Sequence, residues 1–201
     1  MARGDIHSST PAQSVGRVPR VSGDIDRILI SREQIAQRIR ALGAQIAADL
    51  DALGQGAEIV LVPILTGSII FVADLIRELP QKVRLDVVTV SSYPGKSTTS
   101  QDASISGILP QDVAGKHVLI VDDILDSGKT IRLMRDELMK RQPLSVRACV
   151  LLRKQIVSAM DTPCEYVGFD IPDEFVVGFG LDYDHYYRNL PEIGSLRREA
   201  L

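Results

Sequence analysis

Hydrophobic positions change their spacing along the chain, and the two spacings predict different elements. From Ile35 to Leu53 they recur every three or four residues, which predicts one amphipathic helix. Ser31 and Gln34 match a capping box, so this helix is expected to begin just after Ser31. Gly54 follows the last apolar position and predicts where the helix ends.

Short and nearly continuous apolar runs dominate the rest of the chain and predict strands that are covered on both faces. These runs cover residues 57–65, 83–92, 117–121, 146–152, 165–168 and 175–179. Helical patterns cover residues 69–79 and 131–141. Strands that alternate with helices in this way are typical of an α/β fold, in which a parallel twisted sheet is flanked by helices.

The loops that follow the predicted strands are where a binding site is expected, because parallel sheets bind ligands beyond the carboxyl ends of their strands. The relevant loops follow Leu65, Val121 and Leu152. A polar segment at residues 93–104 is too hydrophilic to belong to the core.

Composition supports one globular domain. The chain has 201 residues, of which 45% are hydrophobic and 24% charged, so extensive disorder is excluded. Only 4% are aromatic, so the core must consist mainly of Val, Ile, Leu and Ala. We expect residues 1–22 to form a poorly ordered polar tail and residues 23–201 to form the domain. The net charge of −3 argues against a nucleic-acid partner, which would require an excess of Lys and Arg.

The two cysteines, Cys149 and Cys164, are too few for a disulfide framework and lack the spacing of metal ligands. We interpret them as buried thiols in a reducing compartment. No apolar run reaches the roughly 18 residues that a membrane span requires, and residues 1–20 lack the apolar stretch of a secretory signal. We therefore expect a cytoplasmic protein without a membrane partner.

The most informative segment is residues 118–130, with the sequence VLIVDDILDSGKT. A buried strand runs into the adjacent acids Asp122 and Asp123, and residues 126–130 then open a helix. Backbone N–H groups at a helix start, beside a glycine, bind phosphate well. A nucleoside-triphosphate P-loop is excluded because it requires glycine where the chain has Asp123. A simple helix cap would leave the paired acids unexplained, whereas two adjacent carboxylates suit the hydroxyls of a diol.

This segment resembles the phosphoribosyl-diphosphate (PRPP) binding motif of type I phosphoribosyltransferases. The resemblance implies that Asp122 and Asp123 hold the 2- and 3-hydroxyls of the ribose. It implies that five residues bind the 5-phosphate: Asp126, Ser127, Gly128, Lys129 and Thr130. Asp126 would also be the catalytic residue, because it would take or share a purine proton at N7. The implied fold is that of the family, in which the terminal segments form a small hood beside the sheet.

Other segments resemble the hypoxanthine-guanine members of this family, and the resemblance covers roughly residues 25–197. It is closest over residues 171–196, with the sequence IPDEFVVGFGLDYDHYYRNLPEIGSL. The implied purine-binding residues are Lys154, Phe175, Val176 and Asp182. Lys154 would donate to the 6-oxo group of hypoxanthine or guanine, which the amino group of adenine cannot replace. Phe175 would stack on the purine, and the backbone carbonyl of Val176 would read the edge of the base.

The pyrophosphate group has its own implied site. The residues concerned are Thr66, Gly67, Ser68 and Arg188. In the family a basic residue commonly stands where this chain has Thr66, so affinity through that side chain is not expected here. The family also commonly has a non-proline cis peptide at this point, which would be Leu65–Thr66.

The resemblance implies Mg²⁺ as the cofactor. Asp182 would be its ligand, with Asp122 and Asp123 as further candidates, because Mg²⁺ needs only one or two carboxylates in addition to phosphate oxygens and water. Ser92 and Tyr93 would begin a mobile loop that closes over the site and excludes water.

The activity implied is purine salvage, in which 5-phosphoribosyl is transferred from PRPP to hypoxanthine, guanine or both and pyrophosphate is released. Small-molecule substrates would be the partners, together with further copies of the chain in a homodimer or homotetramer. A transferase for xanthine or adenine, an RNA-binding regulator that senses PRPP, and a catalytically silent homologue are alternatives. Lys154 argues against adenine, the acidic balance of charge argues against RNA, and the presence of Asp126 and Asp182 argues against a silent homologue.

Overall fold

A computed structural model describes residues 21–91 and 104–200 of the chain. Within these residues seven strands form one sheet in the order β5-β4-β2-β6-β7-β8, with β3 paired to β2 beside this path. The strands are β2 (Ile59–Leu65), β3 (Arg84–Leu85), β4 (Val88–Ser91), β5 (Ser104–Ile105), β6 (His117–Leu125), β7 (Ser145–Lys154) and β8 (Tyr166–Ile171). All paired neighbours are parallel except β4 and β5 at the edge. The predicted α/β fold with a parallel sheet is confirmed, with one short antiparallel edge strand in addition.

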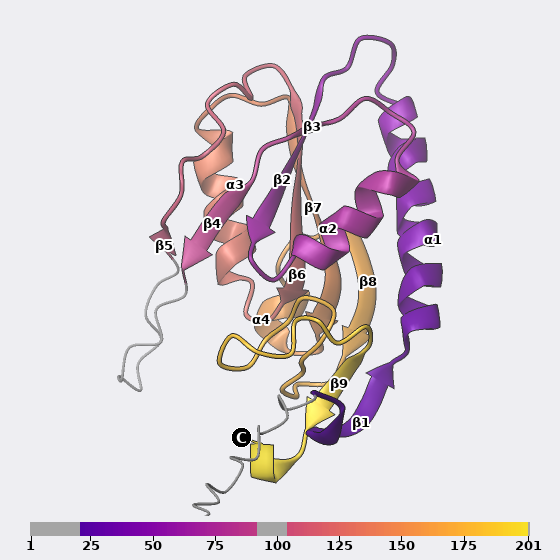
Figure 1. The fold of residues 1–201 in the computed structure, drawn as a ribbon. Helices are drawn as coiled ribbons and strands as arrows, with labels where there is room; N and C mark the ends of the chain where they lie inside the picture. The colour runs from indigo at the N-terminus through magenta and orange to yellow at the C-terminus, as the bar shows by residue number, and fades with distance from the viewer. Residues whose placement is uncertain (1–20, 92–103, 201) are drawn as a thin grey trace, which may run out of the picture.

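Helices cover both faces of this sheet (Figure 1). Helices α1 (Arg32–Asp51) and α2 (Ile69–Leu75) pack on one face, and α3 (Lys129–Met139) packs on the other. The remaining helical elements are α4 (Val157–Met160) and the 3₁₀ turns η1 (Val21–Gly23), η2 (Ile76–Glu78) and η3 (Arg198–Ala200). Successive side chains of a strand point to opposite faces, so Leu61 packs with α1 and α2 whereas Val62 packs with α3. Both faces are therefore buried, as the continuous apolar runs predict.

The capping box at the start of α1 is confirmed. The Ser31 hydroxyl accepts a hydrogen bond from the backbone N–H of Gln34, and the Gln34 side chain accepts one from the backbone N–H of Ser31. The helix ends at Asp51, a little before the predicted end, and Gly54 follows with a positive φ of 91°. The buried residues of this helix are Gly43 and the predicted positions Ile35, Ile39, Leu42, Ile46 and Leu50, whereas the predicted Leu53 lies beyond the helix and is only partly buried.

The terminal segments form a second, two-stranded sheet within the described part of the chain. Strands β1 (Ile25–Ile30) and β9 (Ile193–Leu196) pair antiparallel, and the Arg197 side chain donates to the backbone oxygen of Ile25. Figure 1 shows this pair beyond the carboxyl ends of the central strands. This arrangement is the hood that the family resemblance implies.

One predicted strand, residues 175–179, is wrong. The structure has only isolated bridges there, between Val177 and Gly194 and between Gly178 and Leu181. Gly178 has a φ of 101°, so the chain turns instead of continuing as a strand. A short apolar run does not by itself distinguish a strand from a loop whose side chains are buried in the core. Residues 175–179 form a loop of this kind.

Several predicted boundaries also differ from those of the structure. The single strand predicted at residues 83–92 is interrupted, with β3 and β4 on either side of residues 86–87. Strand β6 continues to Leu125, beyond the predicted end at Val121, so both aspartates lie within it.

The predicted tail lies outside the described residues except for its last two, which belong to η1. None of the helices in the described segments is long and apolar enough to cross a bilayer.

Candidate active site

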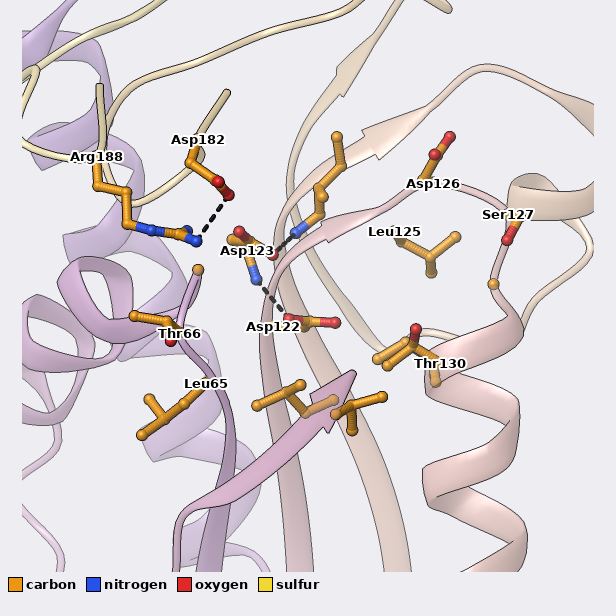
Figure 2. A pocket seen from close by; sticks show the side chains of 16 residues that line it. Leu65, Thr66, Asp122, Asp123, Leu125, Asp126, Ser127, Thr130, Asp182 and Arg188 are labelled. Carbon is orange, nitrogen blue, oxygen red and sulfur yellow. Dashed lines mark hydrogen bonds and ion pairs between the residues drawn. The ribbon is translucent and has the colours of Figure 1, made fainter. Parts of the chain in front are cut away.

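A cavity of about 330 Å³ opens where β2 and β6 end, at the carboxyl edge of the sheet. Most residues singled out from the sequence line it: Thr66, Gly67, Asp122, Asp123, Asp126, Ser127, Gly128, Thr130, Asp182 and Arg188. Figure 2 shows the paired aspartates in the middle, with Asp182 and Arg188 on one side and Ser127 and Thr130 on the other. The loops after two predicted strands therefore meet in one cavity, as expected for a parallel sheet.

The acid pair is the most buried charged group of this cavity. The Asp122 side chain is only 6% exposed and accepts a hydrogen bond from the backbone N–H of Asp123 at 3.1 Å. The Asp123 carboxylate accepts one from the backbone N–H of Ile124 at 2.8 Å. A Cβ atom at Gly67 would clash with the carboxylate of Asp123, so a larger residue where the β2 loop crosses it would displace that carboxylate.

Burial dominates the protonation of this pair. It raises the pKa of Asp122 well above the ordinary range, and the charge of Asp123 raises it further. Burial also raises the pKa of Asp123, although the hydrogen bonds with Asp122 and Ile124 and the charge of Arg188 oppose the rise. Two acids whose charged forms are disfavoured by burial, and which lie beside an open cavity, are typical of a functional site.

The predicted phosphate loop begins α3. Gly128 caps this helix in the left-handed conformation, with a φ of 78°, which glycine adopts without strain. Ser127, Gly128 and Thr130 line the cavity, whereas Lys129 does not. The loop is therefore placed to surround an anion with backbone N–H groups and hydroxyls, without the Lys129 side chain.

Asp182 and Arg188 form the opposite wall. Their side chains pair at 2.7 Å, and the second oxygen of Asp182 accepts from the backbone N–H of His185 at 3.0 Å. Arg188 also donates to the backbone oxygen of Gly180 at 2.6 Å. A Cβ at Gly180 would clash with the backbone oxygen of Gly67, so this loop rests directly on the turn that follows β2. 

The turn after β2 has two further features. The peptide bond Leu65–Thr66 is cis, as the family resemblance implies. Ser68 is fully buried, and its hydroxyl donates to the backbone oxygen of Ile64 at 2.6 Å. The Ser68 side chain thus holds the turn together and does not line the cavity, unlike Thr66 and Gly67.

The predicted base-reading lysine lies beside the phosphate loop. Lys154, the last residue of β7, pairs with Asp126 at 3.1 Å and with Asp173 at 3.0 Å. Burial lowers the pKa of Lys154, but hydrogen bonds with the two carboxylates raise it by more, so it lies above the ordinary value. The lysine is therefore held as a cation within reach of Asp126.

Of the four predicted purine contacts, only Asp182 lines the cavity, and Lys154, Phe175 and Val176 lie outside its lining. The Phe175 side chain is half exposed and meets the Tyr183 ring edge to face, with 5.6 Å between ring centroids. Val176 is buried, so only its backbone could meet a ligand. Ser92 and Tyr93, predicted to begin the mobile loop, lie outside the described residues.

Sequence reasoning missed Asp173 as a partner of the lysine. Strands β7 and β8 pair Lys154 with Ile171, and the chain then brings Asp173 back to the lysine. No local pattern marks this acid, because the contact depends on the pairing of two strands. Its position two residues before Phe175 is the only signal that the sequence offers.

Fold and site together define an α/β protein with an acid pair at a strand end and a glycine loop at a helix start, the features of a phosphoribosyltransferase. Comparison with known proteins agrees: the phosphoribosyl transferase domain matches residues 30–184. The chain belongs to the phosphoribosyltransferase family, in its hypoxanthine-guanine branch.

Two curated relatives and one solved structure illustrate the similarity. The chain is 42% identical over 189 residues to the hypoxanthine-guanine phosphoribosyltransferase of Mycobacterium tuberculosis, which covers 93% of this chain and 92% of the relative. It is 44% identical over 169 residues to the hypoxanthine phosphoribosyltransferase of Salmonella typhimurium, with 84% and 94% covered. A crystal structure of the Staphylococcus aureus hypoxanthine phosphoribosyltransferase superposes with a TM-score of 0.79 at 39% identity, over 89% of this chain and 95% of that one.

Proposed function

We propose that the protein transfers 5-phosphoribosyl from PRPP to N9 of hypoxanthine or guanine, giving a nucleoside 5-monophosphate and pyrophosphate. The observation that carries this proposal is the cavity in which Asp122 and Asp123 lie between the glycine loop of α3 and Arg188. A phosphorylated ribose with a second anionic group fits this order of a phosphate site, an acid pair and a cationic wall. The names of the relatives support the choice of a 6-oxopurine as the acceptor.

The cavity would bind PRPP in a single orientation. The 5-phosphate would accept from the loop at the start of α3, where Ser127 and Thr130 add hydroxyls. The ribose hydroxyls would meet Asp122 and Asp123. The pyrophosphate would face the backbone of Thr66 and Gly67 and the guanidinium of Arg188, whose planar fork suits phosphate oxygens.

The residues act on the reaction in distinct ways. As the bond from ribose C1 to the pyrophosphate oxygen breaks, C1 gains oxocarbenium character, and the carboxylates of Asp122 and Asp123 stabilise the positive charge. The purine N9 forms its bond to C1 from the opposite face, which inverts that carbon. The purine must lose one proton, and we propose that Asp126 accepts it at N7.

Lys154 connects base recognition with this proton transfer. It would donate to the 6-oxo group, and N7 lies next to that group on the same edge of the purine. The 3.1 Å pair between Lys154 and Asp126 already places the two side chains together. Asp173, at 3.0 Å, holds the ammonium when Asp126 turns to the purine. Phe175 would cover the face of the base, and the Val176 carbonyl would accept from its edge.

Mg²⁺ fits the oxygen ligands of the cavity, and we propose Asp182 as its ligand, with Asp122 and Asp123 as the alternative. Among the residues that the structure describes, no group of three His, Cys, Asp or Glu side chains could hold a metal ion unaided. Pyrophosphate and water would therefore supply the remaining ligands, as Mg²⁺ prefers. The ion would neutralise charge on the departing pyrophosphate.

A steady-state assay tests the proposal. PRPP and Mg²⁺ are supplied with hypoxanthine, guanine, xanthine or adenine, and both nucleotide and pyrophosphate are measured. We expect equal amounts of the two products with at least one of hypoxanthine and guanine, and the ratio of kcat/KM values orders the 6-oxopurines. Pyrophosphate release without nucleotide would contradict the proposal.

Light scattering tests the predicted homodimer or homotetramer, and cell fractionation tests the predicted cytoplasmic location.

A further inference from the structure

Arg132, on the first turn of α3, lies behind the phosphate loop. Its guanidinium donates to the backbone oxygen of Ser127 at 2.8 Å and to the backbone oxygen of Ser158 at 3.3 Å. It also donates to the hydroxyl of Thr162. Arg132 therefore joins the loop to the segment that contains α4.

Thr162 is the fixed point of this arrangement. It is only 2% exposed, and its hydroxyl donates to the backbone oxygen of Ser158 at 2.7 Å. A Cβ at Gly128 would clash with this hydroxyl, so the loop lies directly against Thr162. Neither Arg132 nor Thr162 belongs to the lining of the cavity, whereas Ser127 and Gly128 do.

The orientation of one peptide group connects these contacts with phosphate binding. The carbonyl of Ser127 precedes the helix and has no partner in the helical ladder, since the first bond of α3 runs from the Arg132 N–H to the Gly128 oxygen. In a trans peptide the C=O and N–H point in opposite directions. When Arg132 holds the Ser127 oxygen at the back of the loop, the Gly128 N–H must point to the other side.

We infer that Arg132, anchored by Thr162, is a positioning residue that holds the Ser127–Gly128 peptide with its N–H toward a phosphomonoester. This inference rests on the proposed function, because it assigns the loop to the 5-phosphate. It adds a contribution from two side chains that never touch the ligand. An arginine suits this role because its fork binds the loop oxygen and the threonine hydroxyl together.

Binding of GMP and guanosine, measured by calorimetry, tests the inference, because the two ligands differ only in the 5-phosphate. We expect the full-length protein to bind GMP more tightly than guanosine. Arg132→Met should reduce this preference about three- to tenfold, the effect of one lost hydrogen bond, while guanosine binds as before. Arg135→Met is the matched control: Arg135 lies one turn further along α3 and bonds the Val146 oxygen at 2.6 Å and Glu165 at 3.0 Å, away from the loop.

Three further variants separate positioning from charge. Thr162→Val should lower the preference for GMP, whereas Thr162→Ser keeps the hydroxyl and should retain it. Arg132→Lys keeps the charge but loses the fork, so it should restore less than half of the lost preference. Full restoration by lysine would show that charge alone is sufficient and would overturn the inference.

The outcomes also separate this inference from the proposed function. If the unchanged protein binds GMP and guanosine equally, the loop is not a 5-phosphate site and the proposed function fails. If it prefers GMP and Arg132→Met preserves that preference, only the inference fails. An equal loss in Arg135→Met would show that damage to α3 explains the result, which also contradicts a specific role for Arg132.

Discussion

At the proposed phosphate end of the site one stretch of chain supplies the acid pair and the anion loop, whereas at the proposed purine end the side chains come from separate segments. Residues 118–130 run from β6 into α3 without interruption. Lys154 comes from the end of β7, and Phe175 and Asp182 come from the loop before β9. The first end is defined by local sequence, and the second depends on how distant elements pack.

This difference has a mechanistic counterpart. The phosphate end is fixed by backbone contacts, such as those made by Asp122 and Asp123 to neighbouring N–H groups. Between the two ends, the exposed Asp126 of the phosphate loop shares Lys154 with the exposed Asp173, so this contact can be exchanged for a ligand. Substitutions at the purine end should therefore alter selectivity and rate, whereas substitutions at the phosphate end should alter binding and stability.

The largest expected effect concerns the choice of base. Hypoxanthine and guanine should be used up to about 10⁴-fold better than adenine in kcat/KM, because a site built to donate to an acceptor strongly rejects a ligand that lacks it. Lys154→Gln should lower this ratio of kcat/KM values, since an amide can either donate to the 6-oxo group or accept from the amino group of adenine. Lys140→Gln, on an exposed lysine that pairs with Glu137, is the control and should leave it unchanged. Comparable kcat/KM for adenine in the unchanged protein would contradict the role of Lys154.

The two ends of the cavity also differ in how well the sequence predicts them. Helix and strand positions around residues 118–130 follow from periodicity, and the phosphate loop from residue types at a fixed local spacing. The loop before β9 could not be placed, because its apolar residues are buried without forming a strand. The contact of Asp173 with Lys154 depends on the pairing of β7 with β8, and the contact of Arg132 with Thr162 on packing of α4. Such contacts have no local signature.

The second prediction tests the proton acceptor between the two ends. Asp126→Asn keeps the shape of the side chain but cannot accept the purine proton, so kcat should fall by about 10²–10⁴. PRPP binding should stay unchanged or become slightly tighter, because a negative charge beside the 5-phosphate is removed. Lys154 would keep Asp173 as a partner.

Single-turnover kinetics and PRPP titration together measure this effect. Asp136→Asn, an exposed acid on α3, is the matched control and should behave as the unchanged protein. Loss of PRPP binding with normal single-turnover chemistry would instead make Asp126 an organiser of the loop.

The third prediction concerns Asp182, on the wall opposite the phosphate loop. Asp182→Asn should raise the Mg²⁺ concentration for half-maximal rate about tenfold, the factor that corresponds to about 1.4 kcal/mol. The amide oxygen can still accept from the His185 N–H, so the loop should keep its shape. Asp184→Asn is the control, because Asp184 is exposed and its φ of 48° suits asparagine. An unchanged Mg²⁺ dependence in Asp182→Asn would show that Asp182 is not a ligand.

The smallest expected effect is on stability, and it concerns the buried acid at the phosphate end. Burial raises the pKa of Asp122 in the folded state above its unfolded value, which is about 3.9. The folded state then binds the proton more tightly, so the free energy of unfolding decreases as pH rises from the unfolded pKa to the raised one. Asp122→Asn removes the charge but keeps an oxygen for the Asp123 N–H. It should therefore stabilise the protein at neutral pH by about 1 kcal/mol, although the ribose cation loses a stabilising charge.

Urea unfolding at several pH values measures this difference, which should shrink as the pH falls toward about 4. Asp112 offers a contrast of opposite sign, because hydrogen bonds from Lys116 and Arg84 lower its pKa. Its carboxylate stabilises the folded state above the unfolded pKa, and this contribution is lost as the pH falls through the lowered folded value. Asp112→Asn should thus destabilise the protein at neutral pH, whereas Asp122→Asn stabilises it. If Asp122→Asn also destabilises the protein, the acid pair stabilises the fold. Its burial would then not indicate a function that lowers stability.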